Sequence, residues 1–286
     1  MDRAVIKEHI ESFPTWHYQF DLGGQLTLIN REFRINGHEQ RKRYFFEPLI
    51  EVCGGDLRGK RVLDLGCNAG FWSLEAIERG ADFVLGIDGR RMNVDQANFV
   101  FEAKGIDRKR YEFATSNLFE FDYEPYGNFE IVLCLGLMNH VSEPVALMDL
   151  VSRVNDDICV IDTMLSISPG SYLRLRTEDS DGPLNTIERE LVASPTKRAV
   201  IDMARAFGYE IVTLEPHFSD WTGARKYLQG RRKAFIAAKR TPLEMGAYPT
   251  ESDRALPRPS EYLRLVRDVA VNRVRKLVGR WHLPAS

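Results

Sequence analysis

The order of apolar runs along the chain predicts an α/β fold built on a doubly wound, mostly parallel sheet. From residue 61 onward, strand-like apolar runs alternate with helical segments. This alternation is typical of a parallel sheet with helices on both faces. The last two runs, 209–216 and 232–239, are joined by a loop without a convincing helix, so we expect them to pair as an antiparallel hairpin at the end of the sheet. The expected sheet has seven strands, parallel except for the last.

Apolar periodicity gives the approximate bounds of each element. We expect strands at 61–67, 83–88, 110–115, 129–135, 157–163, 209–216 and 232–239. We expect helices between them at about 71–80, 92–104, 143–154 and 196–207, and earlier helices at 3–12 and 39–53.

The chain divides into four expected segments. Residues 1–54 form an N-terminal extension, and residues 55–240 form the α/β domain. Residues 241–260 contain four prolines and are interpreted as a linker. Residues 261–286 carry an apolar stripe at helical spacing, and we expect this C-terminal helix to dock on the domain or on a second copy of the chain as a homodimer. The alternative is that its basic residues meet a membrane surface or an anionic partner.

Composition excludes several classes of protein. Of the 286 residues, 44% are apolar and the formal net charge is −2, which argues against a general nucleic-acid binder. The four cysteines have no metal-knuckle spacing, and we expect small buried side chains in a reducing cytoplasm and no metal site. We expect no signal peptide, because residues 1–13 carry acids and no apolar core run, and no membrane span, because no apolar run approaches the roughly 20 residues that one needs.

The most informative stretch is 61–88, which reads as strand, glycine turn, helix and second strand. Asp64, Gly66 and Gly70 lie at the carboxyl end of the first strand, and Asp88 ends the second. Glycines let a ligand approach the backbone closely, and an acid at the end of the second strand can accept hydrogen bonds from two ribose hydroxyls. The stretch therefore predicts a ligand that contains adenosine.

The spacing of the glycine turn argues against a dinucleotide. A dinucleotide-binding turn has the pattern G-x-G-x-x-G, whose second glycine makes room for the pyrophosphate. Asn68 occupies that position here. A ligand with few phosphates fits better, although an NAD-dependent oxidoreductase stays open as an alternative.

The pattern D-x-G-x-x-x-G, followed by an acid that ends the second strand, resembles the class I S-adenosyl-L-methionine (SAM) methyltransferases. The resemblance covers about residues 55–240 and includes the terminal hairpin. It implies a Rossmann-like methyltransferase fold with SAM as cofactor. It also implies that the glycine loop cradles the methionine part, that Asp88 holds the ribose, and that Asp64 lies near the ligand's amino group.

The end of the fourth strand predicts the reactive end of the site. In a doubly wound sheet the first and fourth strands flank the ligand crevice, so Leu135 and Gly136 are expected to line the sulfonium. His140 follows directly. A histidine here can take the proton of an acceptor hydroxyl, which makes His140 the expected catalytic base.

Three further residues are weaker candidates. Many relatives carry an acid after the third strand that contacts the adenine amino group; here Asn117 can accept that hydrogen bond, or it simply forms a turn. His17 and Tyr18 lie in an aromatic segment that either folds over the site as a lid or packs on the domain. His9, His38 and His282 lie in surface-like contexts.

The insertion at 166–193 is expected to cross the carboxyl edge of the sheet and to form the acceptor pocket. Its polar side chains suit a hydroxylated acceptor such as a saccharide; the alternative is a solvated surface loop. These side chains are Tyr172, Arg174, Arg176, Glu178, Asp179, Asn185 and Glu188.

A narrower resemblance rests on three motifs. These are W-H-Y-x-F-D-L-G (16–23), L-x-G-K-R-V-L-D-L-G-C (57–67) and L-G-L-M-N-H (135–140). Together they are similar to the tRNA wobble-uridine carboxymethyltransferases and their small-molecule methyltransferase relatives. The resemblance implies a tyrosine–histidine pair after the fourth strand, where this chain has Asn139 and His140.

The expected function is SAM-dependent O-methylation of a small polar acceptor, with a saccharide as the example. Cofactor contacts are expected from Asp64, Gly66, Asn68, Gly70, Asp88, Asn117, Leu135 and Gly136, and catalytic roles from His140, His17 and Tyr18. A tRNA wobble-uridine modifying enzyme is the main alternative. A SAM-sensing or scaffold protein without catalysis is the other.

Overall fold

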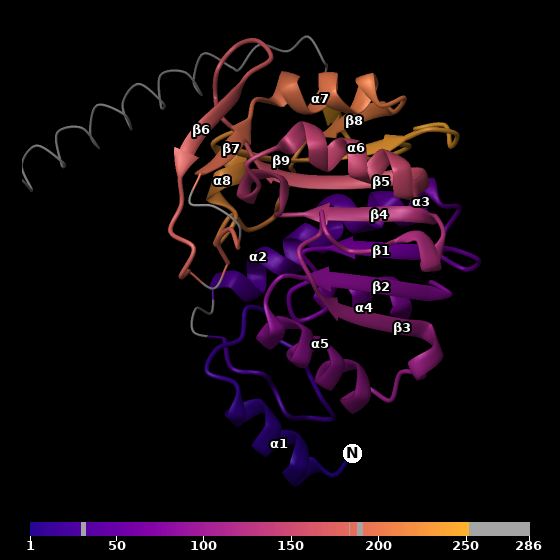
Figure 1. Ribbon diagram of the computed structural model, residues 1–286, viewed down its shortest axis with the longest axis vertical. Coiled ribbons are helices and arrows are strands. Elements are labelled where there is room, and N and C mark those ends of the chain that lie inside the picture. The colour runs from indigo at the N-terminus through magenta and orange to yellow at the C-terminus, as the bar shows by residue number, and fades with distance from the viewer. Residues whose placement is uncertain (30–32, 183, 188–190, 252–286) are drawn as a thin grey trace, which may run out of the picture.

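The computed structural model of the protein describes residues 1–29, 33–182, 184–187 and 191–251. Its centre is an eight-stranded sheet in the order β10-β8-β9-β5-β4-β1-β2-β3 (Figure 1). The strands β1 to β5 pair in parallel, whereas β9 runs antiparallel to both β5 and β8. The doubly wound, mostly parallel sheet is therefore confirmed, as is its antiparallel last long strand.

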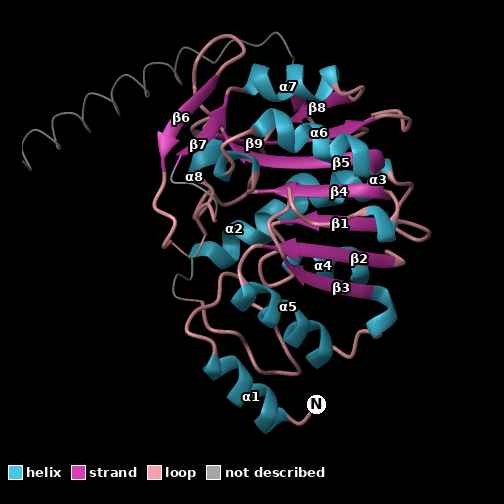
Figure 2. Cartoon of the chain, in the orientation of Figure 1, coloured by secondary structure: helices cyan, strands magenta, loops and turns pink. Residues whose placement is uncertain are grey.

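The seven strands expected from the sequence lie close to their predicted bounds, and three further short strands occur among the described residues. Figure 2 shows the strands in magenta. They are β1 (Arg61–Leu65), β2 (Phe83–Asp88), β3 (Tyr111–Thr115), β4 (Phe129–Leu135), β5 (Asn155–Met164), β6 (Leu173–Thr177), β7 (Leu191–Pro195), β8 (Glu210–Leu214), β9 (Arg232–Ala238) and β10 (Thr250–Glu251).

Helices connect the strands and precede the sheet. They are α1 (Arg3–Ser12), α2 (Phe33–Arg41), a π-helical turn (Lys42–Phe46), α3 (Glu47–Val52), α4 (Phe71–Glu78), α5 (Arg91–Ala103), α6 (Pro144–Val154), α7 (Lys197–Ala206) and α8 (Arg225–Leu228). Short 3-10 turns lie at Arg108–Arg110, Glu124–Tyr126 and Met138–His140.

Both faces of the sheet are buried, and alternate residues of each strand enter different cores. Val62 packs in the core shared with α4, α5 and the N-terminal segment, whereas Leu63 and Leu65 pack in the core shared with α6 and α7. Because side chains alternate across a strand, a strand covered on both faces reads as a continuous apolar run. This is why β1, β2, β4 and β5 were visible in the sequence, whereas the edge strand β3 alternates buried and exposed residues.

The N-terminal segment is packed against the first of these cores. Trp16, Tyr18, Phe20 and Leu22 are all buried, and isolated bridges join this segment to the residues that follow it. The Trp16 indole donates a hydrogen bond to the Ile10 carbonyl, 3.1 Å away. The alternation of buried positions fits an extended segment that lies flat on the domain.

Two expectations about the second half of the chain were wrong, and a third feature was not predicted. The predicted linker, 241–260, supplies β10, where Glu251 forms ion pairs with Lys197 and Lys233; the sheet thus has eight strands and not seven. The loop between β8 and β9 contains the short helix α8. The insertion at 166–193 folds in part as the antiparallel hairpin β6–β7. The four prolines of 241–260 argued against a strand there, so β10 was not predicted. The elements α8, β6 and β7 have four or five residues each, which is too short to show a clear period.

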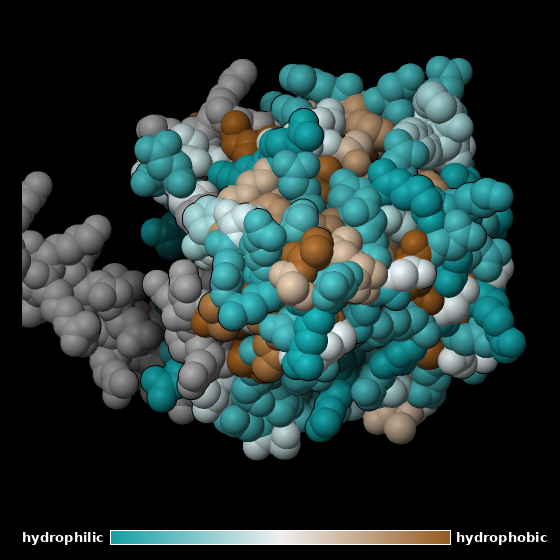
Figure 3. All heavy atoms as spheres, turned by 90° about the horizontal axis from the view of Figure 1, so that it is seen from below, coloured by the Kyte–Doolittle hydropathy of each residue, from teal (hydrophilic) through white to brown (hydrophobic). Residues whose placement is uncertain are grey.

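The expected C-terminal helix, 261–286, lies outside the described residues. None of the helices in the described ranges has both the length and the apolar character needed to cross a bilayer. Seen from below, the molecule presents a mostly hydrophilic surface on which apolar residues are scattered in small patches (Figure 3).

Candidate active site

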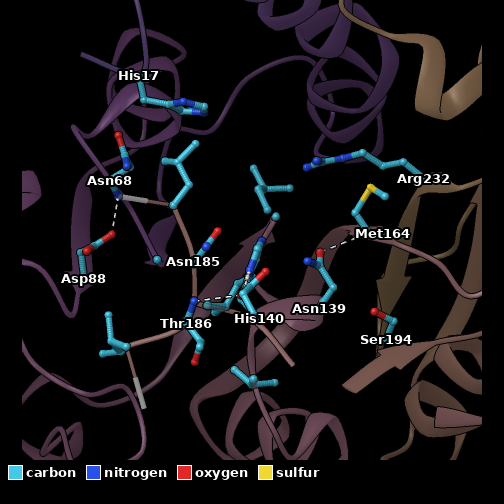
Figure 4. A pocket seen from close by; sticks show the side chains of 18 of the residues that line it. His17, Asn68, Asp88, Asn139, His140, Met164, Asn185, Thr186, Ser194 and Arg232 are labelled. Carbon is cyan, nitrogen blue, oxygen red and sulfur yellow. Dashed lines mark hydrogen bonds and ion pairs between the residues drawn. The ribbon is translucent and has the colours of Figure 1, made fainter. Parts of the chain in front are cut away.

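A cavity of about 850 Å³ lies at the carboxyl ends of β1, β2, β4 and β5. This volume lies in the range of small-molecule and cofactor sites. Of the eleven residues expected in the site, nine line the cavity: His17, Tyr18, Gly66, Asn68, Asp88, Asn117, Leu135, Gly136 and His140. Asp64 and Gly70 are buried and do not line it. In Figure 4, Asn68 and Asp88 lie on one side, Arg232 and Met164 on the other, and His140 between them.

The turn after β1 is held open by left-handed backbone at three positions. Gly66 has φ +71°, Asn68 has φ +51° and Gly70 has φ +76°. Gly70 is enclosed, because a Cβ there would lie 3.1 Å from both Ala97 Cβ and Phe113 Cζ. Asparagine tolerates the left-handed region better than other residues with a side chain. Asn68 can therefore adopt the backbone conformation of a glycine, while its side chain takes up space in the turn that a glycine would leave open.

Asp88 anchors this turn and ends β2. One carboxylate oxygen accepts hydrogen bonds from the Arg90 amide (2.9 Å) and from Asn93 Nδ2 (3.0 Å). The other accepts from the Asn68 amide, 2.9 Å away. Burial raises the pKa of Asp88, and these three donors act against that rise. The carboxylate is fixed in orientation and keeps lone pairs for a ligand's hydroxyls.

Asp64 is buried beneath the turn and does not line the cavity. Its carboxylate accepts a hydrogen bond from Ser73 Oγ at 2.7 Å. Burial raises the pKa of Asp64 to about 7, although the Ser73 bond opposes this, and the charge of Asp88 adds to the rise. A cationic ligand group above the turn would favour its ionised form.

Asn117 lines the far end of the cavity, after β3. Its amide oxygen accepts from the Phe119 amide at 3.0 Å, so the side chain does form a turn. The carbonyl-type oxygen has a second lone pair. The turn and a contact to a ligand's amino group are therefore compatible.

His140 follows β4 and is paired with a residue of the insertion. Its Nδ1 lies 2.6 Å from Glu178 Oε2. Glu178 also accepts from the Thr186 amide at 2.9 Å and from Arg176 Nη1 at 3.0 Å. A carboxylate accepts hydrogen bonds only, so Nδ1 of a neutral His140 carries the proton and Nε2 is left as a base.

Burial and charge together keep His140 neutral. Burial lowers its pKa, the bond and charge of Glu178 oppose this, and the charges of Arg176 and Arg232 lower it further; the net direction is downward. Burial alone would raise the pKa of Glu178, but its bonds with His140, Thr186 and Arg176 hold that pKa below the usual range. At neutral pH the pair is thus a neutral imidazole oriented by an ionised carboxylate.

His17 and Tyr18 reach the cavity from the N-terminal segment. The Tyr18 ring stacks on Phe71 with centroids 4.6 Å apart, and its hydroxyl accepts a hydrogen bond from Trp72 Nε1 at 3.2 Å. The expectation that His38 is a surface residue was wrong, since it is 5% exposed, lines the cavity and packs 4.3 Å from the Tyr18 ring. The polar helix around it gave no sign that the domain covers this face.

The insertion crosses the cavity, and its inner side chains take part in the site. Arg174, Arg176, Glu178 and Asn185 line the cavity, whereas Tyr172 is 61% exposed and Asp179 is exposed. Glu188 lies outside the described residues. The insertion is fastened at the cofactor side by Arg90, whose guanidinium donates to the carbonyls of Asn185 (3.0 Å) and Gly182 (2.9 Å).

A buried cluster of one carboxylate, two arginines and a tyrosine was not predicted from the sequence. Asp162 at the end of β5 accepts hydrogen bonds from Arg41 Nη2 at 2.6 Å, and from Arg232 Nε at 2.9 Å and Nη2 at 2.6 Å. The Tyr227 hydroxyl donates to its other oxygen at 2.8 Å. Arg41, Tyr227 and Arg232 all line the cavity. These residues are up to 191 positions apart, so no local pattern joins them; the only signal was an acid at the end of a buried strand.

The residues present fit a SAM-like ligand. Gly66 and Gly136 line the cavity, where a Cβ would project into its wall, and both have positive φ, +71° and +85°. Asp88 offers an oriented carboxylate on the same side. Within the described ranges, no group of three or more histidine, cysteine or carboxylate side chains is arranged to hold a metal.

A Rossmann-like sheet with this glycine turn and acid defines the class of SAM-dependent methyltransferases. Residues 56–180 match the family model described as a methyltransferase domain. The ubiquinone biosynthesis O-methyltransferase of Psychrobacter cryohalolentis is 33% identical over 178 residues, which are 60% of this chain and 67% of that protein. The chain belongs to the SAM-dependent methyltransferase family, whose cofactor is SAM.

Two more comparisons show how much of the chain is similar to known proteins. The ubiquinone biosynthesis O-methyltransferase of Neisseria meningitidis serogroup C is 35% identical over 122 residues, which are 42% of this chain; the match spans only half of that relative's length. The N-terminal domain of EvdMO1, solved in the presence of S-adenosylhomocysteine (SAH) and D-fucose, has a TM-score of 0.63 at 22% identity, over 85% of this chain and 98% of that one. These relatives lend no support to the tRNA wobble-uridine alternative.

Proposed function

We propose that this protein transfers the methyl group of SAM to a hydroxyl oxygen of a small, polar acceptor, with a saccharide as the model. The observation that carries the proposal is the His140–Glu178 pair at the carboxyl end of β4, 2.6 Å apart. It provides an oriented base beside the strand that faces the reactive end of a bound cofactor.

The chemistry divides between cofactor and protein. Bound SAM supplies an activated methyl group, which an acceptor oxygen takes by in-line displacement. Nε2 of His140 removes the proton of that hydroxyl, while Glu178 holds the imidazole in the tautomer that this requires. Asp88 and the glycine turn fix the cofactor, so that much of the rate comes from orientation.

A polar acceptor is supported by the groups on its side of the cavity. Arg174, Arg176 and Asn185 line the cavity from the insertion, and Ser194 lines it from the end of β7. Hydrogen-bonding groups in a pocket favour substrates that satisfy them, since a buried polar group without a partner costs about 1–3 kcal/mol. Arg176, Asn185 and Ser194 are already hydrogen-bonded within the chain, so this wall of the cavity stays polar, and a long polyprenyl chain would gain no hydrogen bond from it. The fold of EvdMO1, whose domain was solved in the presence of D-fucose, is consistent with the same choice.

Turnover with labelled SAM tests the proposal. The protein is incubated with methyl-labelled SAM and three pools: sugars and glycosides, polyprenylated phenols, and tRNA. We expect label in the sugar pool, a methyl ether by mass spectrometry, and a loss of roughly 100-fold or more in kcat for His140→Ala with SAH affinity unchanged.

The matched control for His140→Ala is His217→Ala. His217 is an exposed histidine that does not line the cavity, so its removal should leave turnover unchanged. Normal turnover of His140→Ala would refute the base assignment, and label confined to the phenol or tRNA pool would refute the acceptor class.

A further inference from the structure

The cavity contains two buried guanidinium groups that share one carboxylate. Arg41 and Arg232 both donate to the same oxygen of Asp162, which is fully buried. In the part of the chain that the structure describes, no second carboxylate bonds to either arginine. The three side chains together therefore carry one unbalanced positive charge.

Unused hydrogen-bond donors lie in the same wall. Arg41 is 9% exposed, and its Nε is inaccessible to solvent and has no hydrogen-bond partner among the described residues. Asn139 is 1% exposed; its Oδ1 accepts from the Met164 amide at 3.1 Å, but its Nδ2 has no described partner. A buried charge and buried N–H donors without acceptors are each unfavourable. Their combination indicates a missing anionic ligand.

This group lies on the acceptor side of the cavity. Arg232 begins β9 and pairs in register with Met164 on β5. Its Nη2 would lie 3.1 Å from a Cβ at Gly136, at the end of β4. Asp88, at the end of β2, lies on the opposite side of the cavity in Figure 4. Neighbouring strands are about 4.8 Å apart, and three such intervals separate β9 from β1. The arginine pair is therefore displaced across the sheet from the glycine turn that follows β1.

The charge of the cavity agrees with this placement. Among the described residues, its lining includes seven arginine and lysine side chains but two carboxylates, although the whole chain has a formal net charge of −2. Positively charged side chains are therefore concentrated at this concave surface. Such a site favours an anion through direct bonds and through its field.

We propose that the acceptor carries an oxyanion, a carboxylate or a phosphate, that binds between Arg41 and Arg232 with the Asn139 amide. This inference rests on the proposed function and narrows its substrate class to acidic acceptors, such as a sugar acid or a sugar phosphate. The hydroxyl to be methylated then lies beside His140, the next residue after Asn139. The forked N–H donors of the two guanidinium groups beside Asp162 suit the oxygens of a planar carboxylate or a tetrahedral phosphate.

Binding to the SAH-loaded protein tests the oxyanion without requiring turnover. Calorimetry compares D-glucose with D-glucuronate and D-glucose 6-phosphate, with inorganic phosphate as competitor. We expect at least one anionic sugar to bind tenfold or more tightly than glucose, and phosphate to displace it. The better of the two identifies carboxylate or phosphate as the source. Equal binding of all three sugars, or no binding of any, would overturn the proposal, and this outcome needs no variant.

Arg232→Gln locates the site, and Arg153→Gln is its matched control. Arg153 is exposed on α6 and pairs with Asp149, so its replacement removes the same charge far from the cavity. We expect Arg232→Gln to abolish the preference for the anion and Arg153→Gln to retain it. A preference that survives in Arg232→Gln would overturn the assignment.

The cofactor's own carboxylate is the competing ligand, and two cofactor analogues separate the cases. SAH has a carboxylate, and 5′-methylthioadenosine lacks the amino-acid part. If Arg232→Gln weakened SAH binding tenfold while sparing methylthioadenosine, the pair would hold the cofactor and the proposal would fall. Loss of turnover in His140→Ala is a separate readout, so failure here and failure of the proposed function are distinguishable.

Discussion

The two sides of the cavity are assembled in different ways. The cofactor side uses Gly66, Asn68, Asp88 and Asn93, all within one strand–turn–helix–strand unit and the first turn of the helix after it. The acceptor side joins Arg41 on α2 to Asp162 on β5 and Arg232 on β9. The first side is encoded locally, whereas the second exists only once the chain has folded.

The two sides also differ in charge. The cofactor side presents a carboxylate held by three N–H donors. The acceptor side presents guanidinium groups in excess of carboxylates, together with the His140–Glu178 pair. An acid suits neutral hydroxyl donors of a nucleoside, and a basic wall suits an anion. If this division is correct, variants on each side should change different measurements.

The largest effect is expected on the cofactor side, from Asp88→Ala. The variant loses its bonds to a ligand's hydroxyls and also the anchor of the Asn68 turn. Hydrogen bonds to a charged group contribute about 1.5–3 kcal/mol each, so SAH affinity should fall by about 100-fold or more. Calorimetry with SAH measures it.

Asp95→Ala is the control, because Asp95 lies on the same helix as Asn93 but pairs with Arg91 at the surface. It should bind SAH like the wild type. An Asp88→Ala protein that still bound SAH within threefold of the wild type would show that the acid is structural only, and the division between the two sides would then fail.

What could be predicted from the sequence follows the same division. The strand at 129–135 was placed at its observed bounds because both faces are buried and the apolar run is continuous. The turn around Gly66 and Asp88 was visible because its spacing is local. Arg41 and His38 lie in a polar helix whose burial depends on the packing of distant segments, and no period in the sequence reports that.

The insertion shows the same limit. Its polar composition suggested an acceptor pocket, but not that Glu178 would reach His140, 38 positions earlier. Nor did it show that Arg90 would hold the loop carbonyls of Gly182 and Asn185. Such pairs depend on how a hairpin lies across the sheet, which composition does not contain.

An intermediate effect is expected on the acceptor side, from Glu178→Gln. His140 must be neutral to act as a base, and its pKa is lowered from the ordinary 6.5; the acid limb of kcat/KM in the wild type therefore lies below pH 6.5. Glu178 is the influence that raises this pKa, so its neutralisation should move the limb to lower pH. The plateau should fall on the order of tenfold as the imidazole loses its orientation.

A pH profile of kcat/KM, with SAH affinity measured beside it, checks this prediction. Glu102→Gln removes the same charge from an exposed position on α5 and should leave the profile unchanged. A limb that moved to higher pH, or an unchanged plateau, would mean that Glu178 holds the insertion in place without acting on His140.

The smallest effect is expected from Asn68→Gly, which tests whether the turn needs the asparagine side chain or only its backbone conformation. Asn68 has φ +51° and gives its amide to Asp88. Glycine adopts this backbone without strain but makes the unfolded chain more flexible, at a cost of about 0.5–1 kcal/mol. It also loses the bond from the Ala69 amide to Asn68 Oδ1. These terms are small, so SAH affinity should stay within about threefold.

Asn68→Val separates backbone from side chain at the same position. A β-branched residue is strained at positive φ, so the valine variant should bind SAH more weakly than the glycine variant, and thermal unfolding should show the same order. Should Asn68→Gly instead lose tenfold in SAH affinity, the asparagine side chain itself would contact the cofactor. The cofactor side would then depend on a specific side-chain bond at this position, and not on the shape of its backbone alone.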